Sequence, residues 1–368
     1  MKATQQLHAL GQSLWLDNIT RELLSSGTLA HYISELSVTG LTSNPTIFEH
    51  AIQQSDFYDA AIRQKTLEGK SGETLFFELA LEDLIQAADL LRTIHDATGG
   101  IDGWVSLEVS PLLADDTAAT IRAAMQLHAR AKRTNLFIKI PGTPAGIPAI
   151  EEAIFAGVPV NVTLLFSREH YLAAAAAYMR GIERRLAAGL DPKIASVASL
   201  FVSGWDVAVK NKAQDEFRNN RLGIAIAMRT YKAYRDLLAS AQWQKLAASG
   251  ALPQRLLWAS TGSKDPASPD TLYVEALAAP DTINTIPEKT LLAFAEHGKV
   301  DSVLPLDEAN TEAVEAVIAE FNREGIDDAS LAAELQREGT AAFAQSWHDL
   351  MTGIAKKSDA LTHVAKLQ

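Results

Sequence analysis

The sequence predicts a single (β/α)8 barrel, the TIM-barrel fold, in which helices surround eight parallel strands. Short apolar, β-branched runs alternate along the chain with longer segments of helical period, as in strand–helix–strand units around a parallel sheet. There are eight such runs, the number that closes a barrel of this kind. The 368 residues include no Pro-, Gly- and Ser-rich linker, so the composition marks no domain boundary.

The predicted strands are short and mostly apolar, as expected for strands covered by helices. The last three are the least clearly delimited by the pattern. In chain order the eight strands are Leu14–Asp17, Val38–Thr42, Trp104–Val109, Leu136–Ile140, Val158–Leu165, Ile194–Val202, Leu256–Ser260 and Thr282–Thr285.

The predicted helices have recognisable start and stop signals. Ser167 precedes an Ala-rich run and is a good N-cap, and Gly189 stands at the expected C-cap. Ser71 opens a second long helical segment, which Gly99 and Gly100 close. From about Asp301 onward only helical periods occur. We therefore expect residues 1–368 to form one domain, with about 301–368 as extra helices packed on the barrel.

Composition and charge exclude several classes of protein. A hydrophobic content of 47% excludes an intrinsically disordered chain. The 33 basic and 45 acidic residues give a net charge of −12, which disfavours nucleic-acid binding. The absence of cysteine excludes disulfides and thiolate metal sites. The first residues lack the apolar core of a secretory signal, and no apolar run is long enough to span a membrane, so we expect a soluble, cytoplasmic protein.

The most informative residue is a lysine inside a strand. Lys139 lies between Phe137, Ile138 and Ile140, and a charged residue within a helix-covered strand must point into the barrel. Burial favours the neutral amine, which is the form that attacks a carbonyl. Lys139 is therefore a candidate Schiff-base lysine. A structural ion pair with Glu108, which lies in the preceding strand, is an equally good interpretation of the spacing alone.

Other catalytic chemistries have no sequence signature. The nine histidines include no HExxH, no HxH and no pair at i and i+4, so no metal site is indicated. The phosphate-binding patterns GxxxxGK[ST] and GxGxxG are absent, as is the GxSxG pattern of serine hydrolases. The sequence thus indicates no metal and no organic cofactor.

Seven blocks in order resemble the transaldolase family, in its longer bacterial branch rather than among the short fructose-6-phosphate aldolases. The helical tail AELQREGTAAFAQSWHDLM is also similar to the family. The blocks are LWLDNITRE, GLTSNPTIF, VSLEVSP, NLFIKIPGT, VPVNVTLLFS, SVASLFVS and LWASTGSKDP, between about residues 14 and 266.

The resemblance implies a cofactor-free cytosolic barrel enzyme that transfers a dihydroxyacetone unit between sugar phosphates. It makes Lys139 the Schiff-base amine and Asp17 the acid/base at the C4 hydroxyl. It makes Glu108 and Thr163 the pair that holds a catalytic water. The substrate-binding residues would include Asn44 and Asn161 on hydroxyls and Ser199 near the donor or phosphate, with Thr42 and Ser260 as further candidates.

Two of these residues also have simple structural interpretations. Asp17 could be the N-cap of the segment Ile19–Leu24, and Asn44 could be the turn residue before Pro45.

The chain departs from the family at one position. The family pattern SxxxxR carries a phosphate-binding arginine, whereas here Ser199 is followed five residues later by Gly204. Lys264, after the seventh strand, is the first candidate for a replacement cation. The alternatives are therefore a transaldolase-like aldolase whose sugar lacks the usual phosphate or, from another class, a non-catalytic barrel that binds a sugar or a protein.

Overall fold

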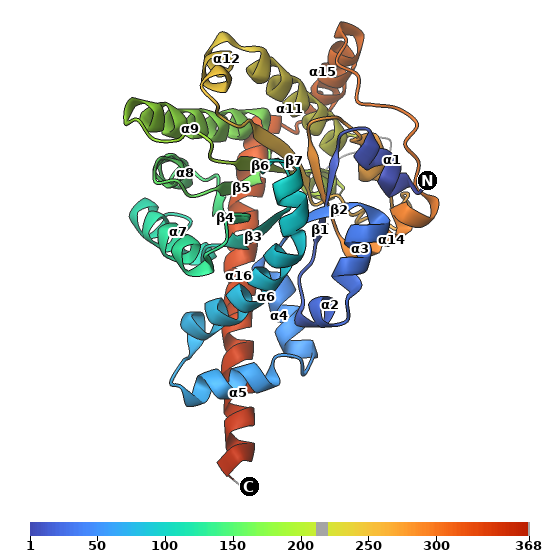
Figure 1. The fold of residues 1–368 in the computed structure, drawn as a ribbon. Coiled ribbons are helices and arrows are strands. Elements are labelled where there is room, and N and C mark those ends of the chain that lie inside the picture. The colour runs from blue at the N-terminus through green and yellow to red at the C-terminus, as the bar shows by residue number, and fades with distance from the viewer. Residues whose placement is uncertain (211–219, 367–368) are drawn as a thin grey trace.

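Eight parallel strands close into a barrel in the computed structural model, which describes residues 1–210 and 220–366 (Figure 1). Each strand pairs with the next in the chain, and β8 pairs with β1. The fold-class prediction is confirmed, and the predicted strand ends differ from the observed ones by at most two residues. The strands are β1 (Ser13–Asp17), β2 (Val38–Thr42), β3 (Trp104–Glu108), β4 (Leu136–Pro141), β5 (Val160–Leu165), β6 (Ser196–Phe201), β7 (Gln254–Ala259) and β8 (Ile283–Ile286).

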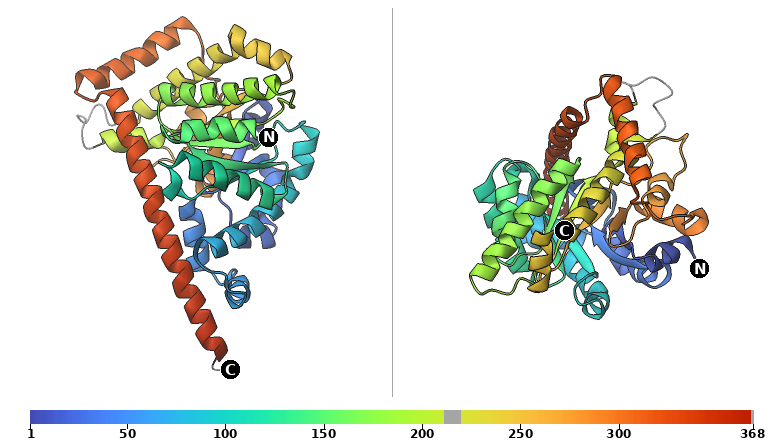
Figure 2. Two further views of the ribbon diagram at one scale, coloured as in Figure 1. Left: turned by 90° about the vertical axis from the view of Figure 1, so that its left-hand side faces the viewer. Right: turned by 90° about the horizontal axis from the view of Figure 1, so that it is seen from above.

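Helices surround the barrel on its outside (Figure 2). Ser167 caps α9 by accepting a hydrogen bond from the His170 backbone N–H, as its position before the Ala-rich run predicts. The helices are α1 (Ala3–Ala9), α2 (Arg21–Ser25), α3 (Thr28–Leu36), α4 (Pro45–Gln54), α5 (Asp59–Leu67), α6 (Gly72–Ala97), the 3-10 turn η1 (Pro111–Leu113), α7 (Thr117–Ala131), α8 (Gly146–Phe155), α9 (Arg168–Ala187), α10 (Ser203–Val209), α11 (Leu222–Ala239), α12 (Ala241–Ala248), α13 (Leu272–Ala276), α14 (Glu288–His297), α15 (Glu308–Arg323) and α16 (Asp328–Lys366).

Alternation along the strands separates two hydrophobic cores. One set of strand residues packs outward against the helices, and the intervening positions form a second cluster inside the barrel. Within it, the rings of Trp104 and Phe137 stack with centroids 4.0 Å apart, and Trp15 lies 6.1 Å from Phe137. Gly40 makes room for the indole, because a Cβ at this position would lie 2.6 Å from Trp15 Nε1. Aromatic rings thus fill the barrel interior.

The last two helices add a layer beside the barrel. Helix α15 packs on α11, and the beginning of α16 joins the same buried cluster through Leu331 and Leu335. Helix α16 then runs along the barrel, contacts α4 and α5, and extends beyond them (Figures 1 and 2).

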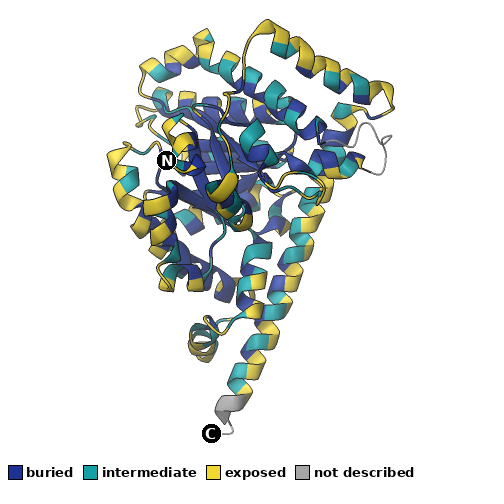
Figure 3. Cartoon of the chain, turned by 90° about the vertical axis from the view of Figure 1, so that its right-hand side faces the viewer, coloured by how far each residue is buried: buried dark blue, intermediate teal, exposed yellow. Residues whose placement is uncertain are grey.

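Burial follows this layered arrangement (Figure 3). The strands are almost entirely buried, whereas the helices present their outer faces to solvent. Among the described residues, no helix combines the length and apolarity needed to cross a membrane.

Candidate active site

The barrel register aligns three polar residues from neighbouring strands in one row. Glu108 on β3 pairs in register with Lys139 on β4, which pairs in turn with Asn161 on β5. Glu108 and Lys139 share strand parity with Trp104 and Phe137 of the inner cluster, so both point into the barrel. They lie nearer the carboxyl ends of their strands, which is where barrels of this kind hold their active sites.

Three groups surround the amine of Lys139. Its Nζ lies 3.1 Å from Glu108 Oε2, and both side chains are at most 7% exposed. Nζ also donates a hydrogen bond of 3.3 Å to the backbone carbonyl of Ser43, after β2. The ring of Phe343, from α16, lies over Nζ with its centroid at 5.6 Å. The ion pair with Glu108 is therefore present, and it leaves the amine inside the barrel mouth with little access to bulk water.

Asp17 ends β1 and is held by a chain of hydroxyl groups. Thr42 Oγ1 lies 2.8 Å from Asp17 Oδ1 and donates to it. The same hydroxyl lies 2.6 Å from Thr285 Oγ1 on β8. The N-cap of α2 is Thr20, not Asp17, so the structural interpretation of Asp17 as a helix cap is wrong. The Asp17 carboxylate is instead oriented by the Thr42 hydroxyl of β2, which is itself in contact with Thr285 of β8.

The two carboxyl groups have altered proton affinities. Burial raises the pKa of Asp17, against the opposing influence of the Lys139 charge, the Thr42 hydrogen bond and the Lys264 charge. Burial likewise raises the pKa of Glu108, opposed by Lys139 and reinforced by the negative charge of Asp17. Both acids therefore hold protons more readily than exposed carboxyls do, as general acids require.

Asn161 is fixed by two serines of adjacent strands. Its Nδ2 donates to Ser106 Oγ at 3.1 Å, and its Oδ1 accepts from Ser199 Oγ at 2.7 Å. Thr163 lies two residues further along β5 on the same face, and its buried Oγ1 has no hydrogen-bond partner in the described part of the chain. An unpaired buried hydroxyl is costly, so Thr163 is suited to bind a water or substrate hydroxyl.

The remaining candidates lie at loops around the same end of the barrel. Asn44 is the N-cap of α4, and its Oδ1 accepts from the Ile47 backbone N–H at 3.1 Å. No described residue accepts from its Nδ2, which stays available to a ligand. Ser260 follows β7, and its Oγ lies 2.8 Å from Ser203 Oγ, so it joins the ends of β7 and β6. Lys264 is exposed in the loop after β7.

Gly204 lies in the first turn of α10, next to Ser203. A Cβ built on it would meet only Phe166 Cε1, at 3.6 Å, so the position has room for a side chain. Its backbone does not require glycine, since it is absent from the left-handed conformations found at other glycines of the described chain.

Helix α16 is attached directly to the strands that carry the site. Gln336 Nε2 donates to the carbonyls of Gly142 and Leu164, at 3.0 and 2.9 Å. These residues stand at the ends of β4 and β5, and Leu164 has a left-handed φ of 59°. This amide satisfies carbonyls at an irregular point of the sheet, where the β5–β6 register shifts.

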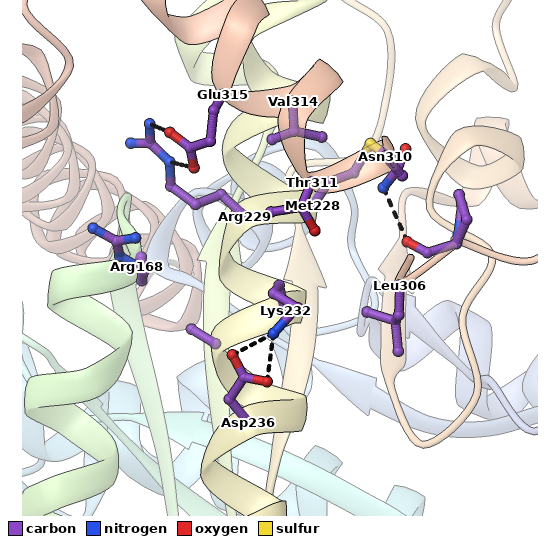
Figure 4. Close-up of a pocket in the computed structure, with 12 residues that line it drawn as sticks. Arg168, Met228, Arg229, Lys232, Asp236, Leu306, Asn310, Thr311, Val314 and Glu315 are labelled. Carbon is purple, nitrogen blue, oxygen red and sulfur yellow. Dashed lines mark hydrogen bonds and ion pairs between the residues drawn. The ribbon is translucent and has the colours of Figure 1, made fainter. Parts of the chain in front are cut away.

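A cavity of about 140 Å³ lies away from this site, against α11 and α15 (Figure 4). Arg229 pairs with Glu315 at 2.5 Å, and Lys232 pairs with Asp236 at 2.6 Å. Because these cations already have carboxylate partners, the cavity offers poor conditions for binding an anion. No group of three potential metal-ligating side chains occurs among residues 1–210 and 220–366.

Sequence reasoning missed several neighbours of the site. Ser106 stands two residues before Glu108, so strand alternation could have indicated it. Thr285 lies two residues after Ile283 of the inner cluster, so the same alternation could have indicated it, whereas the Ser43 carbonyl carries no comparable signal. Phe343 comes from a helix far along the chain, and only tertiary packing brings it to Lys139.

The fold and this arrangement define a barrel with a buried lysine and two buried carboxyls of raised pKa at its carboxyl-terminal mouth. The family model for Transaldolase/Fructose-6-phosphate aldolase matches residues 14–354. The chain belongs to this family.

Full-length relatives agree with the family match. The chain is 42% identical over 365 residues to a transaldolase of Parafrankia sp. (strain EAN1pec), covering 97% of this chain and 98% of the relative. It is 43% identical over 370 residues to a transaldolase of Thermobifida fusca (strain YX), covering 97% and 99%. It is 39% identical over 376 residues to transaldolase 2 of Nostoc sp. (strain PCC 7120), covering 98% of each. The chain is thus a transferase of the transaldolase family.

Proposed function

We propose that this protein moves a dihydroxyacetone unit from a ketose phosphate to an aldose phosphate through a Schiff base on Lys139. Sedoheptulose 7-phosphate and fructose 6-phosphate are the proposed donors, which places the reaction in the pentose phosphate pathway of the cytoplasm. The observation that carries the proposal is the buried Lys139 amine, 3.1 Å from a carboxyl whose pKa is raised. Neither a metal nor an organic cofactor has a role in it.

The residues divide the chemistry between two positions of the sugar. Neutral Lys139 attacks the ketose C2 carbonyl, and Glu108 supplies the proton with which the carbinolamine hydroxyl leaves as water. Thr163 binds the water that these proton transfers use. Asp17 then takes the proton of the C4 hydroxyl, the C3–C4 bond breaks, and the aldose leaves while the three-carbon unit stays on Lys139.

Substrate hydroxyls are assigned to the amides of the site. The free Nδ2 of Asn44 can donate to a hydroxyl, and so can the second N–H of Asn161, whose orientation Ser106 and Ser199 fix. The Thr42 hydroxyl is directed at Asp17, so we assign it to orienting that acid/base as well as lining the site.

The test is chemical trapping. Borohydride treatment in the presence of fructose 6-phosphate is expected to add the mass of a reduced sugar adduct to the intact protein. Lys139→Ala should show no adduct and no transfer, whereas Lys299→Ala, which removes an exposed lysine, should behave as the original chain. Transfer activity above background in Lys139→Ala would overturn the assignment.

Gly204 favours a second candidate, an aldolase-like enzyme whose sugar lacks the usual phosphate. There is space for a side chain beside Phe166 at this position, but glycine places no cationic group there. Lys264 is the alternative phosphate ligand, since it follows β7 at the same end of the barrel and its charge opposes the raised pKa of Asp17.

Gly204→Arg tests whether the missing arginine impairs phosphate binding. Charge-assisted hydrogen bonds contribute about 1.5–3 kcal/mol each, so a restored clamp should raise kcat/KM for fructose 6-phosphate by about 10- to 150-fold. A gain of this size, set against Gly204→Ala as the control, supports impaired phosphate binding. Ordinary activity in the original chain without any gain means that the phosphate is held elsewhere, with Lys264 as the first candidate.

A further inference from the structure

Helix α16 holds an aromatic ring directly over the amine of the site. Phe343 lies with its ring centroid 5.6 Å from Lys139 Nζ. Two buried side chains of the same helix anchor it on either side of this residue. Gln336 bonds the ends of β4 and β5, and Trp347 Nε1 donates to Glu73 Oε1 at 3.1 Å. The ring is therefore positioned by the helix.

The distance between Lys139 Nζ and the ring of Phe343 leaves room for one carbon atom bonded to the nitrogen. A carbon bonded to Nζ stands about 1.45 Å from it. Placed on the ring side, that carbon would lie about 4 Å from the ring plane's centre, which is ordinary van der Waals contact between carbon atoms. A ketose carbon attached to Lys139 would thus pack against the face of Phe343.

We propose that Phe343 is a catalytic residue, whose ring face stabilises the cationic iminium formed on Lys139. The inference rests on the proposed function, since it concerns the Schiff base itself. An aromatic face attracts a cation within about 6 Å, and the attraction rises from about 0.5 kcal/mol at exposed sites to about 2 kcal/mol where water is excluded.

The chemical step places the new charge beside the ring. The neutral amine bonds to the ketose carbon, and a proton moves from nitrogen to the carbonyl oxygen to give the carbinolamine. The hydroxyl leaves as water with a proton from Glu108, so the C–O bond breaks and C=N forms. The product is an iminium cation shared between nitrogen and carbon, while Glu108 becomes a carboxylate.

The hydrogen bonds of the free lysine cannot all persist in the iminium. The ammonium form has three N–H donors, and it contacts both Glu108 Oε2 and the Ser43 carbonyl. The iminium nitrogen keeps one N–H, so it loses at least one of these partners. Part of its charge also moves onto carbon, nearer to the ring than Nζ was. Phe343 therefore favours the iminium over the free lysine.

The experiment varies the ring's electrostatics without changing its shape. Phenylalanine carrying one, two or three ring fluorines is placed at position 343, and adduct formation is measured over a range of fructose 6-phosphate concentrations by borohydride quench and intact mass. The apparent association constant for adduct formation should fall in steps with each fluorine, by about two- to thirtyfold in total. Phe343→Leu, which keeps apolar bulk, should resemble the trifluorinated protein.

The control series places the same fluorinated residues at Phe294, a fully buried ring on α14. These proteins should show an unchanged adduct constant. An equal constant across the Phe343 series overturns the inference and leaves only a packing role for this ring. Absence of any adduct in the original chain would instead overturn the proposed function, and this inference with it.

Discussion

In the proposed mechanism, the carboxylates of Asp17 and Glu108 act on different atoms of the substrate. Glu108 lies at the amine, whereas Asp17 is directed from β1 by the Thr42 hydroxyl. The raised pKa of each comes first from burial, so each can return a proton at neutral pH more readily than an exposed acid. In the proposed mechanism, β3 thus supplies the acid for imine formation and β1 the acid/base for carbon–carbon cleavage.

This division predicts a specific defect in Asp17→Asn. Carbon–carbon cleavage should slow by about 10²–10⁴-fold, the usual contribution of a positioned acid/base, while the borohydride-trapped donor adduct still forms. Thr42→Val, which removes the hydroxyl that contacts Asp17 and Thr285 but keeps the Asp17 carboxylate, should have a smaller effect on turnover. A variant of Asp17 that neither turns over nor forms an adduct would place this residue in imine chemistry or folding instead.

Much of the site's residue composition was predictable, because strand alternation marks the inward positions. A charged residue such as Lys139 within an apolar run indicates a side chain that faces the barrel interior, since helices cover the outside. The partners of these residues were less predictable. Asn161 could be recognised as polar and inward, but its two serine contacts depend on the barrel register.

Among the elements, α16 shows where pattern reasoning stops. Helical periods in the chain after residue 301 predicted helices there, but a period does not state which surface a helix covers. The buried positions of α16 contact the ends of β4 and β5 in one part and α4 and α5 in another. The strand predictions succeeded because both faces of a barrel strand are buried, one against the helices and one inside the barrel, and this burial limits the residue types on each face.

Gln336 provides a test of this attachment. Gln336→Leu leaves the buried carbonyls of Gly142 and Leu164 without their donor, at a cost of about 1–3 kcal/mol for each unsatisfied group. We expect the free energy of unfolding to fall by about 2–6 kcal/mol, measured by urea titration. Gln345→Leu, at an exposed position on the same helix, is the matched control. Equal stability of the two variants would contradict the structural role of Gln336.

Across the whole molecule, buried acids shape the response of stability to pH. Asp206 joins α10 to α11 and α13, since it accepts from the backbone N–H groups of Leu222 and Gly223 and from the Tyr273 hydroxyl. Burial raises its pKa to about 6. A carboxyl with a raised folded-state pKa stabilises the fold fully below its unfolded pKa, near 4, and this contribution is lost as pH rises toward 6.

Asp206→Asn should therefore remove a pH dependence. In the original chain this group lowers the free energy of unfolding by up to about 3 kcal/mol between pH 4 and pH 6. Urea titrations across this range should show a correspondingly smaller decline in the variant, while Asp115→Asn, at an exposed site, should follow the original chain. Parallel curves for all three proteins would contradict the raised pKa.

The single-domain organisation of the chain stays a prediction. One cooperative transition in these urea titrations is the result expected for a single domain.

The position of Phe343 has a consequence for the synthesis and folding of the protein. Chains emerge from the ribosome amino-terminal end first, and all eight strands precede α16. The nascent barrel can therefore enclose Lys139, Glu108 and Asp17 while the ring that covers the amine is still unmade. If that ring stabilises the iminium as proposed, the enzyme reaches full activity only after α16 has been synthesised and has docked on the barrel.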